Sequence, residues 1–289
     1  MSSAADNITA APRATWRDYY ELTKPNVVLL MILTSAIGMF MAVPGMVPLD
    51  ALLLGNLGIA LCAGAAAAVN HLVDERVDQR MARTHKRPVA QGKIGTRQAA
   101  LFALVLGGLG MSILLLWINT LTAWLTLFSR LGSAVFYTMF LKRATPQNIV
   151  IGGLAGAAPP LLGWTAVTGE VHGHALLLVL IIFAWTPPHF WALAIHRGEE
   201  YAAVDIPMLP VTHGVPFTKM HILLYTIIMF LITLLPYATR LSGPLYLLGA
   251  VMLGAGFLYW AGELMWGKNK NAPMETFKYS LVYLAALFV

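Results

Sequence analysis

Three oxygen-bearing side chains recur every fourth residue: Asn70, Asp74 and Asp78. In a helix each step of four residues advances by about 40°, so the three side chains share one face and lie one turn apart. Mg²⁺ prefers a few oxygen ligands of this kind, completed by water and substrate phosphates. The spacing therefore predicts a Mg²⁺ site, against the simpler interpretation of a solvated helix end.

Cations follow these acids directly. Arg83 and Arg87 are four residues apart, which would place both on one face of a helix. Guanidinium groups bind phosphate oxygens bidentately, so acids followed by arginines suit a metal-bound diphosphate. We expect Arg83 and Arg87 to bind such a group, although the charge bias of membrane loops would also place cations here.

Lys142 and Arg143 form a second cationic group at the end of an apolar segment. We expect both side chains to bind the same diphosphate and Lys142 to assist the chemical step. The alternative is a stop-transfer anchor.

A second acidic group contains Glu199, Glu200 and Asp205. Carboxylates at the same membrane depth could hold the other side of a diphosphate through a second metal ion. Adjacent helical residues point in different directions, so we expect one of the two glutamates to serve the site and the other to face water.

Two polar side chains fall inside apolar segments. An arginine within a membrane normally faces a polar cavity or a partner, so we expect Arg130 to line a cavity or to pack against an acid. His189 follows Pro187 and Pro188, which predict a bend or break in its helix. A proton carrier, a ligand contact and a hydrogen-bonded core histidine are all compatible with His189.

The composition indicates the elements that must position these residues. Of 289 residues, 58% are hydrophobic and 11% are charged, against roughly 25% charged in soluble domains. This excludes a soluble globular domain and makes lipid the expected solvent. The net charge of +6 reflects the basic loops of membrane proteins, so we expect no nucleic-acid partner. The single cysteine excludes an intrachain disulfide framework.

Nine apolar segments approach the length of about 20 residues that a bilayer-spanning helix requires. They are 24–43, 50–70, 98–118, 120–141, 148–168, 174–195, 219–239, 243–266 and 277–289, the last being short. We predict an all-α polytopic membrane protein, a bundle of about nine transmembrane helices. Residues 1–23 form a cytoplasmic N-terminal segment and residues 24–289 a single transmembrane domain, which leaves no room for a separate soluble domain.

The basic residues predict the orientation. Seventeen of the 19 lysines and arginines fall on one side of the predicted spans, and the loops of the other side contain only Arg240. Because cytoplasmic loops are enriched in Lys and Arg, we predict a cytoplasmic N-terminus and a cavity that opens to the cytoplasm, where both acidic groups lie.

The segment Asn70-x3-Asp74-x3-Asp78, followed by Arg83-Thr84-x2-Arg87-Pro88, resembles the first signature of the UbiA-type intramembrane prenyltransferases. Residues 142–153, 156–160, 188–189 and 206–211 resemble the members of that family that farnesylate protohaem IX. The resemblance covers the chain from about Thr23 to Val211. Where members carry an aspartate before the Tyr201 position, this chain has Glu200, preceded by Glu199.

The resemblance implies transfer of a farnesyl group from farnesyl diphosphate to a vinyl group of protohaem IX (haem B), which gives haem O for terminal oxidases. It implies a multi-pass protein of the bacterial inner membrane with Mg²⁺ as cofactor, held by Asn70, Asp74, Asp78 and either Glu200 or Glu199. It suggests haem contacts for His189 and Tyr137. Membrane lipid, haem A synthase and oxidase assembly factors are candidate partners.

Other functions stay open. Prenylation of a quinone or chlorophyll precursor would use the same aspartate motif. An ion-coupled transporter would also place acids in a membrane, but here they cluster at one face and no inverted repeat is visible. A non-catalytic haem-handling protein would leave the clustering of acids and arginines unexplained.

Overall fold

The computed structural model describes residues 14–80, 84–141, 144–203 and 206–288, apart from the side chains of residues 135, 136, 138 and 139. Every regular element within these ranges is a helix. The longer α-helices are α2 (Pro25–Ala42), α3 (Asn56–Asp78), α4 (Thr96–Ile113), α5 (Thr120–Leu131), α9 (Gly173–His196), α12 (Val215–Ala238), α13 (Pro244–Trp266) and α14 (Ala272–Phe288). The shorter ones are α1 (Trp16–Leu22), α7 (Asn148–Gly156), α8 (Pro159–Thr168), α10 (Gly198–Ala202) and α11 (Leu209–Thr212). Three π-helical segments, η1 (Ala51–Gly55), η2 (Leu114–Ile118) and η3 (Gly132–Leu141), continue or precede α-helices.

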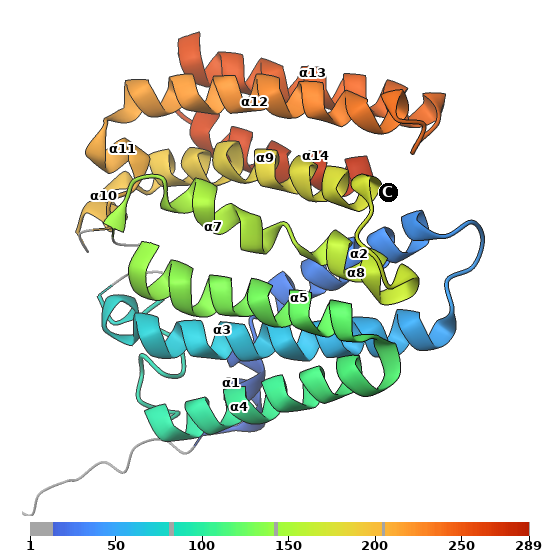
Figure 1. Cartoon of the computed structure of the whole chain (residues 1–289). Helices are drawn as coiled ribbons and strands as arrows, with labels where there is room; N and C mark the ends of the chain where they lie inside the picture. Colours follow the sequence, from blue (N-terminus) through green and yellow to red (C-terminus); the bar gives the residue numbers. More distant parts are fainter. Residues whose placement is uncertain (1–13, 81–83, 142–143, 204–205, 289) are drawn as a thin grey trace, which may run out of the picture.

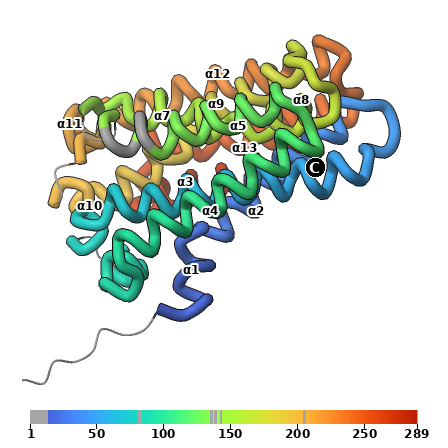
Figure 2. Tube along the Cα trace, turned by 60° about the horizontal axis from the view of Figure 1, so that its bottom comes forward, coloured from blue at the N-terminus to red at the C-terminus, as the bar shows by residue number. Residues whose placement is uncertain are grey.

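The long helices lie side by side as a bundle (Figures 1 and 2). The group α3, α4 and α5 forms one part of it, and α12 and α13 form the opposite part. Between them, α9 packs against α7, α12 and α14. The described chain is thus a single bundle of helices, which confirms the predicted all-α class of a polytopic membrane protein.

Seven helical segments of the described chain are long and apolar enough to cross a bilayer. They correspond to seven of the nine predicted spans, so the predicted count of nine is not confirmed. The two remaining predicted spans, 120–141 and 277–289, fall on helical segments that do not meet these criteria of length and hydropathy. Residues 120–141 change from α5 to the π-helical η3, and α14 has only 17 residues.

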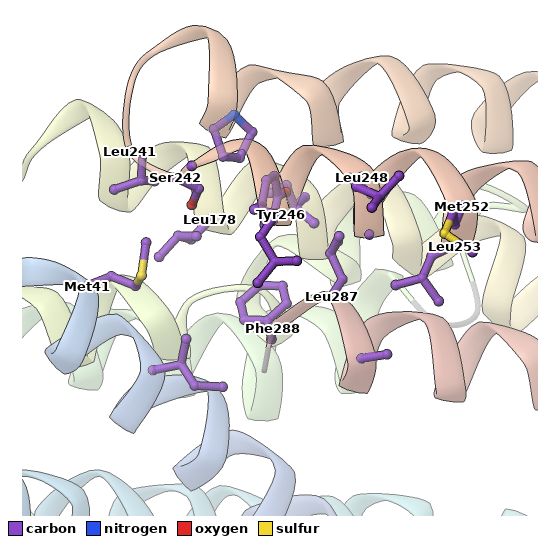
Figure 3. A pocket seen from close by; sticks show the side chains of 18 residues that line it. Met41, Leu178, Leu241, Ser242, Tyr246, Leu248, Met252, Leu253, Leu287 and Phe288 are labelled. Atoms are coloured by element: carbon purple, nitrogen blue, oxygen red, sulfur yellow. The ribbon is translucent and has the colours of Figure 1, made fainter.

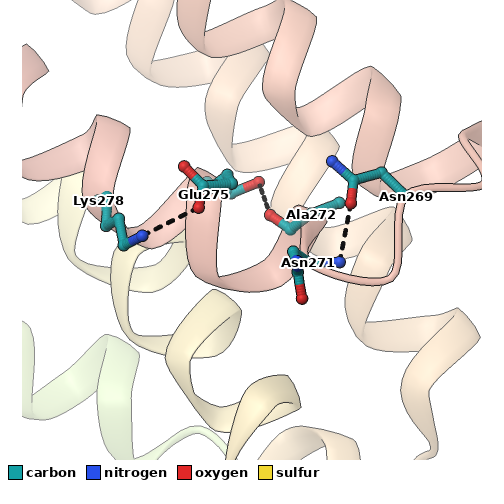
Figure 4. A network of polar contacts seen from close by, with 6 residues as sticks. Asn269, Asn271, Ala272, Glu275 and Lys278 are labelled. Atoms are coloured by element: carbon teal, nitrogen blue, oxygen red, sulfur yellow. Dashed lines mark hydrogen bonds and ion pairs between the residues drawn. The ribbon is translucent and has the colours of Figure 1, made fainter.

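The start of α14 explains why the last apolar segment looked short in the sequence. The helix begins at Ala272, five residues before the predicted span, with a turn in which the side chain of Asn269 accepts a hydrogen bond from the backbone N–H of Asn271 (2.9 Å) (Figure 4). Glu275 and Lys278 form an ion pair of 2.9 Å on the first turns. These polar residues lengthen the helix without adding to the apolar segment.

Glycine permits the closest helix contact in the bundle, between α2 and α8. A Cβ at Gly38 would clash with the backbone of Pro160, and a Cβ at Gly163 would clash with the backbone of Ser35. The backbones of the two helices therefore come into close contact at these positions, which only glycine permits.

The predicted break at the prolines of α9 does not occur. The helix runs without interruption from Gly173 to His196 through Pro187 and Pro188. Nearby, the hydroxyl of Thr186 donates to the carbonyl of Ile182 (2.8 Å). Packing against α7, α8, α12 and α14, among other helices, accompanies this uninterrupted helix although two backbone donors are missing.

Candidate functional site

A cavity of about 590 Å³ lies where α3 ends, beside the start of α2. Its polar and charged lining residues are Glu21, Lys24, Asn26, Asn70, His71, Asp74, Asp78, Arg87, Tyr137, Asn148 and Tyr201. They come from α1, α2, α3, η3, α7, α10 and two connecting segments. Residues far apart in the sequence thus share one polar cavity at one end of the bundle.

The last two turns of α3 position the acidic motif. This helix continues beyond the predicted span 50–70 as far as Asp78, so Asn70, Asp74 and Asp78 all lie on it. All three line the cavity, and both aspartates are buried. The side chains of Asn70, Asp74 and Asp78 thus face the same cavity, as the four-residue spacing predicted.

Arg87 reaches this cavity by a route that the sequence did not predict. Residues 84–87 form turns and a bend rather than a helix, so the prediction that Arg87 stands on a helical face is wrong, and Arg83 lies outside the described residues. The chain folds back, and the Arg87 guanidinium donates to the Asp78 carboxylate at 2.6 Å. The hydroxyl of Thr84 also donates to the Asp78 carbonyl oxygen (3.3 Å).

The turn that carries Arg87 is held by its own apolar residues. Val89 and Ile94 are buried against Leu22 of α1 and Ala68 of α3. Burial of this kind stabilises by about 1.5–3 kcal/mol for each aliphatic side chain. The position of Arg87 therefore depends on α1 as well as on α3.

Several predicted site residues lie outside the described residues. They are Arg83, Lys142, Arg143 and Asp205. Their predicted roles stay predictions.

Neither glutamate of the second acidic group is among the residues that line the cavity. Glu199 is exposed, and the Glu200 carboxylate lies 3.6 Å from the Arg197 guanidinium. Tyr201, the next residue, lines the cavity instead. The structure thus does not bring either glutamate to Asp74 and Asp78, and metal binding by Glu199 or Glu200 stays a prediction.

Tyr137 lines the cavity because α7 makes room for its ring. A Cβ at Gly152 would clash with the ring of Tyr137. Gly152 belongs to the segment that carried the resemblance, and its lack of a side chain is what places the tyrosine against α7.

His189 is not among the residues that line this cavity. Its ring is buried, stacked on Trp185 (centroids 4.1 Å apart) and on Phe277 of α14 (4.6 Å). The Ser280 hydroxyl lies 2.6 Å from its Nδ1 and donates to the Phe277 carbonyl oxygen at the same distance. The imidazole is thus held by stacking and by a polar contact with Ser280, as expected of a core histidine with a hydrogen-bond partner. A haem contact by His189 stays a prediction.

Six polar cavity residues were not assigned to the site from the sequence, namely Glu21, Lys24, Asn26, His71, Asn148 and Tyr201. Lys24 adopts a left-handed backbone conformation (φ 51°) directly before Pro25, and Asn148 is buried at the start of α7. Both belong to segments that carried the resemblance, which was the available signal. His71 offered no such signal, because a histidine after Asn70 is indistinguishable from an ordinary core histidine.

The donor set can be tested against Mg²⁺. Within the described ranges, no three His, Cys, Asp or Glu side chains are grouped so as to hold a metal ion. Mg²⁺ does not require such a cage, since it binds through one or two carboxylates together with water and phosphate oxygens. Two aspartates and one amide beside Arg87 and Lys24 fit a Mg²⁺-bound diphosphate.

A second cavity, of about 640 Å³, lies at the other end of the bundle (Figure 3). Met41, Leu178, Leu287 and Phe288 are among its lining residues, and none of the residues that line it is acidic or basic. It therefore offers no charged side chain for a diphosphate, unlike the polar cavity.

The comparison with known families decides the identity. The sequence matches the UbiA prenyltransferase family over residues 31–284. The chain belongs to this family. It is a multi-pass membrane protein and a prenyltransferase, as its apolar helices and its UbiA membership show.

Relatives within the UbiA family are closely similar. The protoheme IX farnesyltransferase of Saccharophagus degradans is 72% identical, over 96% of this chain and 91% of its own length. That of Teredinibacter turnerae is 68% identical, over 100% of this chain and 92% of its own length.

Solved UbiA structures share the fold at low identity. A digeranylgeranylglyceryl phosphate synthase superposes with a TM-score of 0.80 at 19% identity, over 94% of this chain and 95% of its own. A UbiA homolog from Archaeoglobus fulgidus, bound to GPP and Mg²⁺, superposes with a TM-score of 0.66 at 16% identity, over 94% and 98%. These likenesses establish the UbiA fold of the chain.

Proposed function

We propose that this prenyltransferase joins the farnesyl group of farnesyl diphosphate to a vinyl group of protohaem IX and so forms haem O. The observation that carries the proposal is the 72% identity, over nearly the whole chain, to a protoheme IX farnesyltransferase. The polar cavity supplies the groups that this reaction requires.

The charged residues act on the diphosphate. Mg²⁺ held by Asn70, Asp74 and Asp78 would neutralise the diphosphate and so favour its departure. The guanidinium of Arg87, already in the cavity beside Asp78, binds the phosphate oxygens. We propose the same role for Arg83, Lys142 and Arg143.

The bond changes are as follows. The C1–O bond of farnesyl diphosphate breaks, and diphosphate leaves with the bonding electron pair. The terminal vinyl carbon of haem attacks C1, and the resulting cation at the inner vinyl carbon takes up water and releases a proton. Aromatic and apolar side chains at the cavity, such as Phe190 and Ile149, keep bulk water from the first cation.

The membrane placement follows from the same site. We propose a bacterial inner-membrane location with the N-terminus in the cytoplasm, since the basic loops and the polar cavity lie at the same end. Residues 24–289 form the single transmembrane domain. The N-terminal segment before this domain contributes Leu22, which is buried in one cluster with Ala68 of α3 and so ties α1 to the site.

The test uses the purified protein in detergent with haem B, farnesyl diphosphate and Mg²⁺. We expect a product with the mass of haem O, together with stoichiometric release of diphosphate. Parallel reactions contain a quinone precursor or a chlorophyll precursor as acceptor. Prenylation of one of those acceptors and not of haem would contradict the proposal.

A further inference from the structure

Arg130 is a buried cation with almost no partner. Only 7% of its surface is exposed, although it belongs to α5 within the predicted span 120–141. Among the described residues, its Nε and Nη2 atoms have no hydrogen-bond partner, and Nη1 contacts only the Met31 sulfur at 3.5 Å. An unpaired charge in a membrane is costly and normally marks a functional site.

The guanidinium lies inside the bundle. It reaches from α5 to Met31 on α2, and the same side chain lines a cavity of about 180 Å³. Small residues of α3, among them Cys62, Ala65 and Ala66, form one wall of that cavity. Their short side chains leave space beside the unpaired hydrogen-bond donors of Arg130.

Arg130 belongs to a helix that also contributes to the polar cavity, although the two cavities have no lining residue in common. Along the helix formed by α5 and η3 it precedes Tyr137 by about two turns. Its contact Met31 follows Val27 by about one turn of α2, and both Tyr137 and Val27 line the polar cavity. A rigid substrate with its reacting group beside Asp74 and Tyr137 could therefore extend to Arg130.

We propose that Arg130 binds a carboxylate of the acceptor substrate, namely a propionate of haem. This proposal rests on the proposed function. The propionates lie across the macrocycle from the vinyl groups, so a vinyl group at the polar cavity directs a propionate deeper into the bundle. A carboxylate matches the guanidinium fork and neutralises it. The farnesyl chain has no atom that could accept a hydrogen bond from Arg130. In the proposed function its diphosphate is bound by the cations of the polar cavity.

Haem binding can be measured without turnover. The Soret absorbance of haem B is titrated with the detergent-solubilised protein, in the absence of farnesyl diphosphate and Mg²⁺. The variants are Arg130→Met, Arg130→Lys and, as the matched control, Met31→Leu. We expect Arg130→Met to raise the Kd for haem B roughly thirtyfold or more, since it removes one partner of a buried ion pair. Arg130→Lys should recover part of the affinity, and Met31→Leu should stay within about twofold of the wild type.

The dimethyl ester of haem B tests the carboxylate directly. In the wild type, esterification should weaken binding by about the same factor as Arg130→Met weakens binding of haem B. In Arg130→Met, esterification should change the Kd little. An equal loss on esterification in both proteins, or no loss in the wild type, would overturn the proposal.

Two controls keep the outcomes distinct. Thermal unfolding should show Arg130→Met to be at least as stable as the wild type, because methionine replaces an unpaired buried charge. If that variant fails to fold, the wild type alone still decides, since equal affinity for haem B and its dimethyl ester overturns the proposal. Wild-type protein that never converts haem B would contradict the proposed function, whereas normal conversion with no ester effect contradicts only the role of Arg130.

Discussion

The guanidinium of Arg87 lies 2.6 Å from the carboxylate of Asp78, and both side chains line the polar cavity at the end of α3. The two residues belong to different elements, since Asp78 ends α3 and Arg87 follows in a turn. A Mg²⁺-bound diphosphate would engage both partners of this pair, the carboxylate through the metal and the guanidinium through phosphate oxygens. The pair therefore places a metal-binding carboxylate beside a phosphate-binding guanidinium, which are the two groups that the proposed reaction requires.

Asp74→Asn and Asp78→Asn should each reduce the rate of haem O formation by about 100-fold or more, because each removes charge that supports departure of diphosphate. Product is measured by mass spectrometry. Glu75→Gln is the matched control, since Glu75 lies on α3 but does not line the cavity. Turnover of Asp74→Asn or Asp78→Asn at the control's rate would refute the assignment of the motif.

Arg87→Lys should raise the KM for farnesyl diphosphate about tenfold, because lysine keeps the charge but cannot form the bidentate contact. Arg87→Ala should cost more, since it also leaves the Asp78 carboxylate without this cation. Initial rates at varied farnesyl diphosphate measure both. Arg76→Ala, an exposed cation two residues before the end of α3, serves as control and should leave KM unchanged.

Chelation should abolish turnover. Two aspartates and one amide would complete a Mg²⁺ site only together with water and diphosphate, so we expect a chelator to compete effectively for the ion. We expect excess EDTA to stop haem O formation and added Mg²⁺ to restore it. A rate that does not respond to EDTA would argue against metal-assisted ionisation.

Gly152→Ala should destabilise the protein by about 1–3 kcal/mol and reduce turnover, because the new Cβ would displace the ring of Tyr137. Gly156→Ala is the control on the same helix, since nothing lies within contact distance of a Cβ there. Thermal unfolding and initial rates are compared for both. The double variant Gly152→Ala, Tyr137→Leu should recover part of the lost stability, and no recovery would contradict the clash.

Asp18 should make the docking of α1 dependent on pH. Hydrogen bonds to its carboxylate from the side chain and backbone of Thr15, together with Lys93 at 3.8 Å, hold the pKa of Asp18 below its ordinary value. A lowered pKa stabilises the folded state above the unfolded value of 3.8, and this contribution is lost as the pH falls below it. The unfolding temperature of Asp18→Asn should therefore be lower than that of the wild type at pH 6, and the difference should shrink as the pH falls below 3.8. A difference that stays constant over this pH range would contradict this role.

Features within one helix could be predicted from the sequence. Most spans follow from apolar length, and the shared face of Asn70, Asp74 and Asp78 follows from the helical period. Both depend only on local geometry, since backbone hydrogen bonds in lipid must be satisfied within each segment. Lys24 and Asn148 lie in the segments that carried the resemblance, but the sequence alone did not assign them to the site.

The contacts between segments depended on the tertiary structure. Arg87 reaches Asp78 through a turn held by Val89 and Ile94, not through the helical spacing from Arg83. Glu200 lies beside Arg197, whereas Tyr201 lines the cavity. Adjacent side chains of a helix point in different directions, so the orientation of α10 decides which of the two faces the cavity. The unpaired donors of Arg130 could be recognised only once its neighbours were known. The sequence thus determined which side chains share a helix face, whereas packing between helices decided which of them meet, because that packing sums many weak contacts over the whole chain.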